Sequence, residues 1–137
     1  MTRIAISFLS FFALTLTLYS CKKNDSNPTC TACAGGNTQI VVYALHNGDT
    51  IIHSAQQSDT AFIAWSDAGD PPNPNYYDKY YVAEEGEDHI HLSSLNCGTY
   101  RIRLSVFDTV TAKRYTGSAT MSFTKTSGEV DTAIVVN

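Results

Sequence analysis

Residues 98–107 constrain the fold more than any other stretch, because their side chains alternate between apolar and polar. The alternating side chains are Tyr100, Ile102, Leu104 and Val106 on one side and Thr99, Arg101, Arg103 and Ser105 on the other. A period of two places these sets on opposite faces of a β-strand, so that one face meets a hydrophobic core and the other meets water. The stretch therefore predicts a strand in a layered β structure.

Short segments of the same type occupy the rest of the chain, rich in Val, Ile, Thr and Tyr and separated by Gly, Asn, Asp and Pro. The expected strands cover residues 38–45, 50–54, 60–65, 77–82, 89–92, 98–107, 119–123 and 130–136. No segment of any length has a helical period. Seven to nine strands in about 100 residues predict an all-β fold, a single antiparallel β-sandwich of immunoglobulin-like or prealbumin-like type. Three prolines within residues 66–76 predict one long exposed loop.

The beginning of the chain has the three parts of a secretory signal. Arg3 supplies the positive charge, residues 4–18 form an apolar run, and Ser20 is a small residue before a cleavage point. A transmembrane helix needs about 20 apolar residues, and this run is shorter and interrupted by Ser and Thr. We therefore expect a cleaved signal peptide over residues 1–20 and no retained transmembrane segment.

The sequence Leu18-Tyr19-Ser20-Cys21 resembles the lipobox of bacterial lipoproteins. The resemblance implies that Cys21 becomes the lipidated first residue of the mature chain, and more than one acyl chain gives stable anchoring. The polar stretch that follows resembles lipoproteins of the Bacteroidota, many of which lie in the outer membrane. Lys22 follows the cysteine instead of the Asp that retains enterobacterial lipoproteins in the inner membrane. The alternative is an ordinary cleaved signal with a chance cysteine.

Without the signal, 117 residues remain, which is enough for one domain. We expect a lipidated cysteine and flexible tether over residues 21–37 and a β-sandwich over residues 38–137. Eight Lys and Arg stand against thirteen Asp and Glu in this part, and no basic patch is present. Nucleic-acid binding is therefore disfavoured, and the expected membrane contact is through the lipid anchor.

The segment Leu95-Asn96-Cys97-Gly98-Thr99-Tyr100 resembles the L-x-x-G-T-Y turn and strand of prealbumin-like sandwiches, which include carboxypeptidase regulatory-like and Cna-B-like domains. Cys97 takes the place of the usual proline. Fibronectin type III domains share a similar Trp-bearing strand and Gly-Thr-Tyr region. Members of these groups are mostly spacers, accessory modules or binding domains, so the resemblance implies a non-catalytic role.

The cysteines beyond Cys21 are Cys30, Cys33 and Cys97. Cys30 and Cys33 have the C-x-x-C spacing of redox and zinc sites. They lie in the expected tether and not at a helix start, and exported thiols tend to oxidise, so a structural disulfide is favoured. Cys97 bonded to Cys30 or to Cys33 is preferred because that bond closes a long loop, and a local bond between Cys30 and Cys33 is the alternative.

His89 and His91 lie on one face of an expected strand, after an acidic turn. Two imidazoles in this arrangement occur in metal sites. Ile90 and Leu92 point to the other face, however, so the histidines fall on the solvated side, where polar residues are expected anyway. We therefore predict a solvated face, with no metal and no cofactor.

Motifs for catalysis are missing from the sequence. It contains no G-x-S-x-G elbow and no glycine-rich phosphate loop, and its carboxylates show no pairing that assigns acid and base roles. Asp67, Asp70 and Asp78 could hold calcium, which is an alternative, but they lack the ordered spacing of an EF-hand loop. We therefore predict that the protein is not an enzyme.

One group of aromatic residues suggests recognition: Trp65, Tyr76, Tyr77, Tyr80 and Tyr81. Flat rings beside a polar loop can stack on sugar faces, whereas a buried Trp between two sheets is ordinary for a sandwich. The sequence thus predicts a lipid-anchored cell-envelope protein, located in the outer membrane, whose β-sandwich is a non-catalytic interaction or accessory module. The alternative is a carbohydrate-binding surface lipoprotein, and the expected partners are an envelope protein or a glycan.

Overall fold

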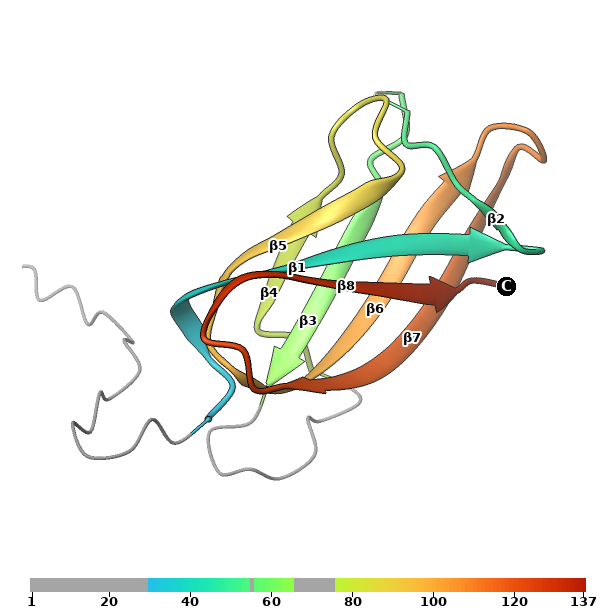
Figure 1. The fold of residues 1–137 in the computed structure, drawn as a ribbon. Coiled ribbons are helices and arrows are strands. Elements are labelled where there is room, and N and C mark those ends of the chain that lie inside the picture. Colours follow the sequence, from blue (N-terminus) through green and yellow to red (C-terminus); the bar gives the residue numbers. More distant parts are fainter. Residues whose placement is uncertain (1–29, 55, 66–75) are drawn as a thin grey trace, which may run out of the picture.

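A computed structural model describes residues 30–54, 56–65 and 76–137 and shows an all-β sandwich. Eight strands follow one another along the chain (Figure 1). They are β1 (Ala34–His46), β2 (Asp49–Thr50), β3 (Thr60–Trp65), β4 (Lys79–Val82), β5 (His89–Leu95), β6 (Gly98–Asp108), β7 (Lys113–Phe123) and β8 (Ser127–Val135).

The strands form two sheets of four, which we call sheet A and sheet B. In sheet A, β1 pairs with β8 along one edge and with β5 and β2 along the other. Sheet B has the order β4-β3-β6-β7. Every pairing is antiparallel except that of β1 with β8, which is parallel over residues 37–45.

The core lies between the two sheets and is built from the inward half of each alternating pattern. In β6 the apolar set identified from the sequence is completely buried, and Ile40, Val42 and Ala44 of β1 face it from sheet A. Burial of each large apolar side chain contributes about 1.5–3 kcal/mol. The largest buried side chains are Tyr100, Ile40, Ile63, Ile90, Leu92, Leu95, Ile102 and Leu104.

The domain begins earlier than the expected boundary at residue 38. Ala32 is 3% exposed and belongs to the core, and the side-chain amide of Asn96 donates to the carbonyl oxygen of Thr31 at 3.1 Å. The structure also joins Cys30 to Cys97 by a disulfide with a Cα–Cα distance of 4.9 Å. Residues 30–37 are thus part of the sandwich and not of a flexible tether, because packing and a covalent bond hold them on its end.

Tyr100 connects this N-terminal segment to the start of β6. Its hydroxyl accepts the N–H of Cys33 at 3.1 Å and lies 2.6 Å from the carbonyl oxygen of Asn96. Burial raises the pKa of Tyr100 to about 12, although its hydrogen bonds to the backbone act in the opposite direction. Gly98 makes the close approach possible: its φ is 147°, and a Cβ there would lie 2.3 Å from the backbone nitrogen of Ala32.

The end of the chain links the two sheets at one corner. The residue after the last core position, Asn137, exchanges backbone hydrogen bonds with Thr116 of β7, at 3.1 and 3.3 Å. Gly117 lies beside this link, and a Cβ there would meet the carbonyl oxygen of Val135 at 2.2 Å. The corner therefore depends on a residue without a side chain.

Several expectations fall outside the described residues. These are the signal peptide of residues 1–20, the lipidated Cys21, the tether up to residue 29 and the loop over residues 66–75. In the part of the chain that is described, no helix has the length and apolar character needed to span a membrane.

Candidate functional site on the outer face of sheet A

Glu87, His89 and His91 gather on the outer face of sheet A, and we call them the histidine cluster. The two histidines are on β5, where Ile90 and Leu92 turn inward as the sequence predicts. Glu87 lies just before β5, two residues ahead of His89. His89 and His91 are two residues apart on β5, which places their side chains on one face of the sheet. Glu87 precedes the bend at Asp88, and its carboxylate reaches the same face.

The cluster brings three potential ligand atoms close together. The two Nε2 atoms are 3.0 Å apart, and Oε2 of Glu87 lies 3.7 Å from each of them. The two distances of 3.7 Å from Glu87 are too long for hydrogen bonds. Oε2 of Glu87 is also shielded from solvent and has no hydrogen-bond partner among the described residues. The arrangement therefore goes beyond the solvated face expected from the sequence.

Neighbouring side chains fix the orientation of both imidazole rings. Oδ1 of Asp88 lies 2.7 Å from Nδ1 of His89, and this hydrogen bond holds the pKa of the Asp88 carboxyl below its ordinary value. A carboxylate can only accept, so Nδ1 carries the proton and Nε2 of neutral His89 presents a lone pair to the cluster. The amide nitrogen of Gln39 is hydrogen-bonded to Nδ1 of His91 and also donates to Glu129 at 3.0 Å.

The turn that carries Glu87 is held by the backbone of His53. The N–H of His53 donates to the carbonyl oxygen of Glu87 at 2.8 Å, and the N–H of Gly86 donates to the carbonyl oxygen of His53 at 3.0 Å. The position of Glu87 is therefore set by a distant part of the chain and not only by β5.

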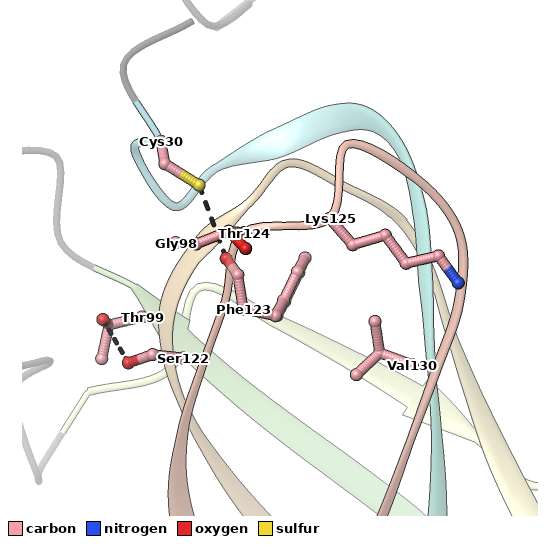
Figure 2. Close-up of a pocket in the computed structure, with 8 residues that line it drawn as sticks. All are labelled: Cys30, Gly98, Thr99, Ser122, Phe123, Thr124, Lys125 and Val130. Atoms are coloured by element: carbon pink, nitrogen blue, oxygen red, sulfur yellow. Dashed lines mark hydrogen bonds between the residues drawn. The ribbon is translucent and has the colours of Figure 1, made fainter.

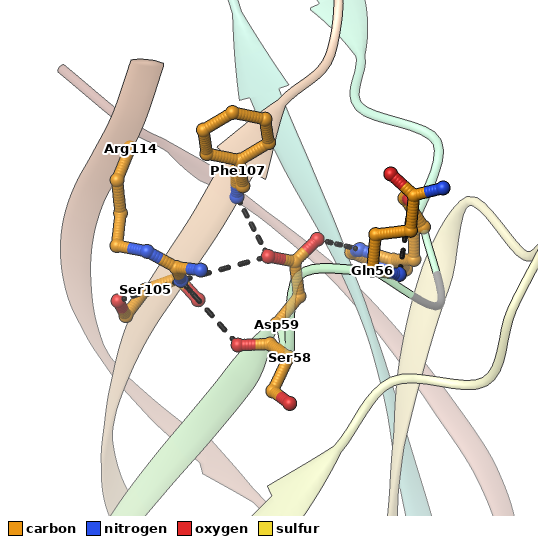
Figure 3. Close-up of polar contacts among 8 residues, drawn as sticks. Gln56, Ser58, Asp59, Ser105, Phe107 and Arg114 are labelled. Carbon is orange, nitrogen blue, oxygen red and sulfur yellow. Dashed lines mark hydrogen bonds and ion pairs between the residues drawn. The ribbon is translucent and has the colours of Figure 1, made fainter. Parts of the chain in front are cut away.

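A buried carboxylate, that of Asp59, fixes His53 in turn. Figure 3 shows Asp59 with Phe107 and Arg114. Oδ2 of Asp59 is 2.8 Å from Nδ1 of His53, and the two side chains are only 0% and 2% exposed. Oδ1 of Asp59 accepts the N–H of Phe107 at 2.6 Å and lies 3.6 Å from Nη1 of Arg114. A His–Asp pair can serve as a general base, but this pair is closed off from solvent and joins the β2–β3 connection to β6 and β7.

The outer face of sheet A carries negative charge around the cluster. Glu129 and Asp131 of β8 are opposite Gln39 and Val41 of β1 in the parallel pairing. Burial, together with the nearby charges of Asp131, Asp88 and Glu129, raises the pKa of Tyr43 on the same face. Because these carboxylates lie on the same face as the two imidazoles, the face favours a bound cation.

The aromatic residues named from the sequence do not form one surface. Trp65 packs against the core, and its ring meets the ring of Tyr100 edge-on at 6.3 Å. Tyr81 also packs against the core, and its hydroxyl donates to the carbonyl oxygen of Ser93 at 2.7 Å. These two residues contribute to packing, which is the alternative that the sequence leaves open for Trp65.

The remaining tyrosines lie toward solvent near the outer face of sheet B. Tyr76 and Tyr80 are 59% and 64% exposed. Tyr80 is opposite Phe62 in the pairing of β4 with β3, and the ring of Tyr77 lies 5.6 Å from that of Phe62. Arg103 is opposite Phe62 on the β6 side. We call Phe62, Tyr77 and Tyr80 the outer aromatic face.

An open hollow of about 490 Å³ lies at the end of the sandwich that carries the disulfide (Figure 2). Its lining is Cys30, Gly98, Thr99, Ser122, Phe123, Thr124, Lys125 and Val130. The hydroxyls of Thr99 and Ser122 are hydrogen-bonded to each other at 2.7 Å. Lys125 is the one titratable side chain among these lining residues, so the hollow does not bring an acid and a base together.

Comparison with known proteins gives no match: no family model, no curated protein and no solved structure is similar to this chain. The class of the protein is therefore defined by its own structure, a β-sandwich with a histidine cluster on one outer face and an aromatic face on the other. Sequence reasoning missed Glu87 as a partner of the two histidines. Glu87, His89 and His91 form an E-x-H-x-H pattern in the sequence, but Glu87 precedes the strand, so a period of two does not by itself bring it to the histidines.

Proposed function

We propose that this chain is a lipid-anchored protein of the bacterial cell envelope whose β-sandwich acts as a non-catalytic interaction or accessory module. The observation that carries the proposal is the lipobox-like sequence ending in Cys21, only nine residues before Cys30. Nine residues extend at most about 30 Å. Cys30 is bonded to Cys97 at one end of the sandwich, so this end would stay close to the membrane.

Such an attachment gives the domain a defined orientation. The turn between β1 and β2 and the turn between β6 and β7 lie at the end opposite the N-terminal segment (Figure 1). These turns would point away from the membrane, and the outer faces of both sheets would be open to partners from the side. An envelope protein or a glycan is the proposed partner, and the outer membrane is the proposed location.

The anchor is tested by replacing Cys21. In cells fed an alkyne fatty acid, the wild-type protein should take up the label and fractionate with membranes, and Cys21→Ser should do neither. Ser26→Ala is the matched control, because it changes a nearby residue outside the lipobox, leaves every cysteine in place and should keep the label. Label on Cys21→Ser, or an unlabelled wild-type protein in the soluble fraction, would show that the proposal is wrong.

The outer aromatic face supports a second candidate function, the binding of carbohydrate. Tyr80 is exposed beside Phe62, and Arg103 is placed to donate to sugar hydroxyls. Wild-type protein should bind cell-wall or dietary polysaccharides in affinity electrophoresis, and Tyr80→Ala should abolish the retardation. Val82→Ala is the matched control, because Val82 is two residues along the same exposed strand and is 52% exposed. Equal retardation of both variants would exclude this face.

A further inference from the structure

We propose that Glu87, His89 and His91 form a binding site for one zinc-like divalent metal ion on the outer face of sheet A. The inference goes beyond the proposed function, because it requires neither the lipid anchor nor a partner. It rests on the positions of three ligand atoms, on their chemistry and on the groups that hold them.

The spacing of the ligand atoms fits a tetrahedral ion. Two ligands at about 2.1 Å from such an ion lie about 3.4 Å apart. The three separations here are 3.0, 3.7 and 3.7 Å. The triangle they define has a circumscribed radius of about 2.0 Å, so an ion about 2.1 Å from each atom lies slightly out of their plane, as in a tetrahedral site. One ion can therefore bind all three atoms with little movement of the three ligand side chains.

The donor set selects the class of metal. Two imidazole nitrogens with one carboxylate oxygen suit zinc and its neighbours among the divalent transition metals, whereas calcium and magnesium prefer oxygen ligands only. The three atoms come from the only such group within the described residues. Three protein ligands leave a fourth position open to solvent.

Glu87 supplies an independent observation. Its Oε2 is shielded from solvent and lacks a hydrogen-bond partner among the described residues, although it points at two nitrogen atoms. The Glu87 side chain is 33% exposed as a whole, but a shielded carboxylate oxygen without a partner still carries a cost. A bound cation would give this oxygen the partner that the protein does not provide.

The groups behind the ligands already resemble the outer shell of a metal site. Asp88 accepts from Nδ1 of His89, as carboxylates do behind zinc-bound histidines, so the Nε2 lone pair of His89 points into the cluster. In the metal-free state, the Gln39 amide donates to Nδ1 of His91, so Nε2–H of His91 donates to His89. Metal binding requires the other neutral tautomer of His91, in which Nδ1–H donates to the Gln39 amide oxygen. The amide must turn over for this, which gives up its hydrogen bond to Glu129.

Titration of tag-free, full-length protein with zinc chloride in a calorimeter tests the proposal. Wild-type protein should take up one Zn²⁺ per chain. His89→Ala, His91→Ala and Glu87→Gln should each weaken binding at least about tenfold, because each removes one of three ligands. His46→Ala is the matched control: His46 stacks on Tyr115 away from the cluster, and its loss should leave the affinity unchanged.

A second measurement identifies the atoms that bind. In long-range ¹H–¹⁵N spectra of the histidine rings, zinc should shift the Nε2 signals of His89 and His91 and leave those of His46 and His53 in place. This readout does not depend on the stability of any variant. The proposal is wrong if wild-type protein takes up no stoichiometric zinc, if the cluster variants bind like the wild type, or if zinc shifts His46 instead.

Discussion

Replacing Asp59 by Ala should cost a large part of the stability of the sandwich. The carboxylate is completely buried and makes two short hydrogen bonds, to the N–H of Phe107 and to Nδ1 of His53. A hydrogen bond to a charged group contributes about 1.5–3 kcal/mol, and the donors left behind would be buried without a partner. The ion pair with half-exposed Arg114 adds less than about 1 kcal/mol. We therefore expect the free energy of unfolding to fall by about 3–5 kcal/mol.

The measurement is urea unfolding of the purified, oxidised protein, followed by circular dichroism and by the fluorescence of Trp65. Asp59→Asn should lose less, about 1–3 kcal/mol, since its amide oxygen can still accept the N–H of Phe107. Asp131→Ala removes an exposed carboxylate and should change stability by about 0.5 kcal/mol or less. A loss below about 1 kcal/mol for Asp59→Ala would refute the view that this buried carboxylate holds the strands together.

Three further predictions concern the corner of the sheets and the dependence of stability on pH. Gly117→Ala should lower the melting temperature markedly, because the new Cβ would meet backbone at Val135; an unchanged thermal melt would contradict this close approach. The pKa of Tyr100 is raised above its unfolded value of 10.0. The protonated hydroxyl therefore contributes fully to the free energy of unfolding below pH 10, and this contribution is lost as the pH rises toward about 12. Tyr100→Phe should therefore be less stable at pH 7 and lose less stability in alkali, as urea titrations at several pH values will show. Hydrogen bonds, of which that from Thr111 has the largest effect, lower the pKa of Asp108 below 3.8. The wild type should therefore be more stable to unfolding than Asp108→Ala above that pH, and this difference should vanish as the pH falls below it. A difference in stability that stays constant down to pH 2 would argue against this hydrogen bonding.

The alternating pattern predicted the fold class well because burial decides which half of each strand faces inward. The strand expected over residues 98–107 is β6 with one added residue, and the strand expected over residues 60–65 is β3 without change. The expected strand over residues 119–123 is only the end of β7, which starts at Lys113. Its inward positions at the missed end include Tyr115 and Gly117, which lack the aliphatic character that marks a strand in the sequence.

The region after β2 shows where the hydropathy of the sequence fails to predict strand length and burial. The sequence predicts a strand over residues 50–54, but pairing stops at Thr50, and Ile52 is exposed whereas His53 is buried. The inward position of His53 depends on the carboxylate of Asp59 and on backbone hydrogen bonds with the turn before β5. The hydrogen bonds between His53 and the turn at Gly86 and Glu87 join parts of the chain that are distant in the sequence, so no local pattern reveals them. The same is true of Gln39, which orients His91 from another strand.

The two outer faces of the sandwich differ in chemistry, and this difference follows from strand order. β8 and β5 flank β1 in sheet A, which brings Glu129 and Asp131 to the same face as the histidine cluster. In sheet B, β3 lies between β4 and β6, which places Phe62 between Tyr80 and Arg103. A cation fits the first face, and a neutral or acidic ligand with flat apolar surfaces fits the second. Because the proposed anchor would hold the domain by one end, a metal ion and a glycan could be bound at the same time on opposite sides.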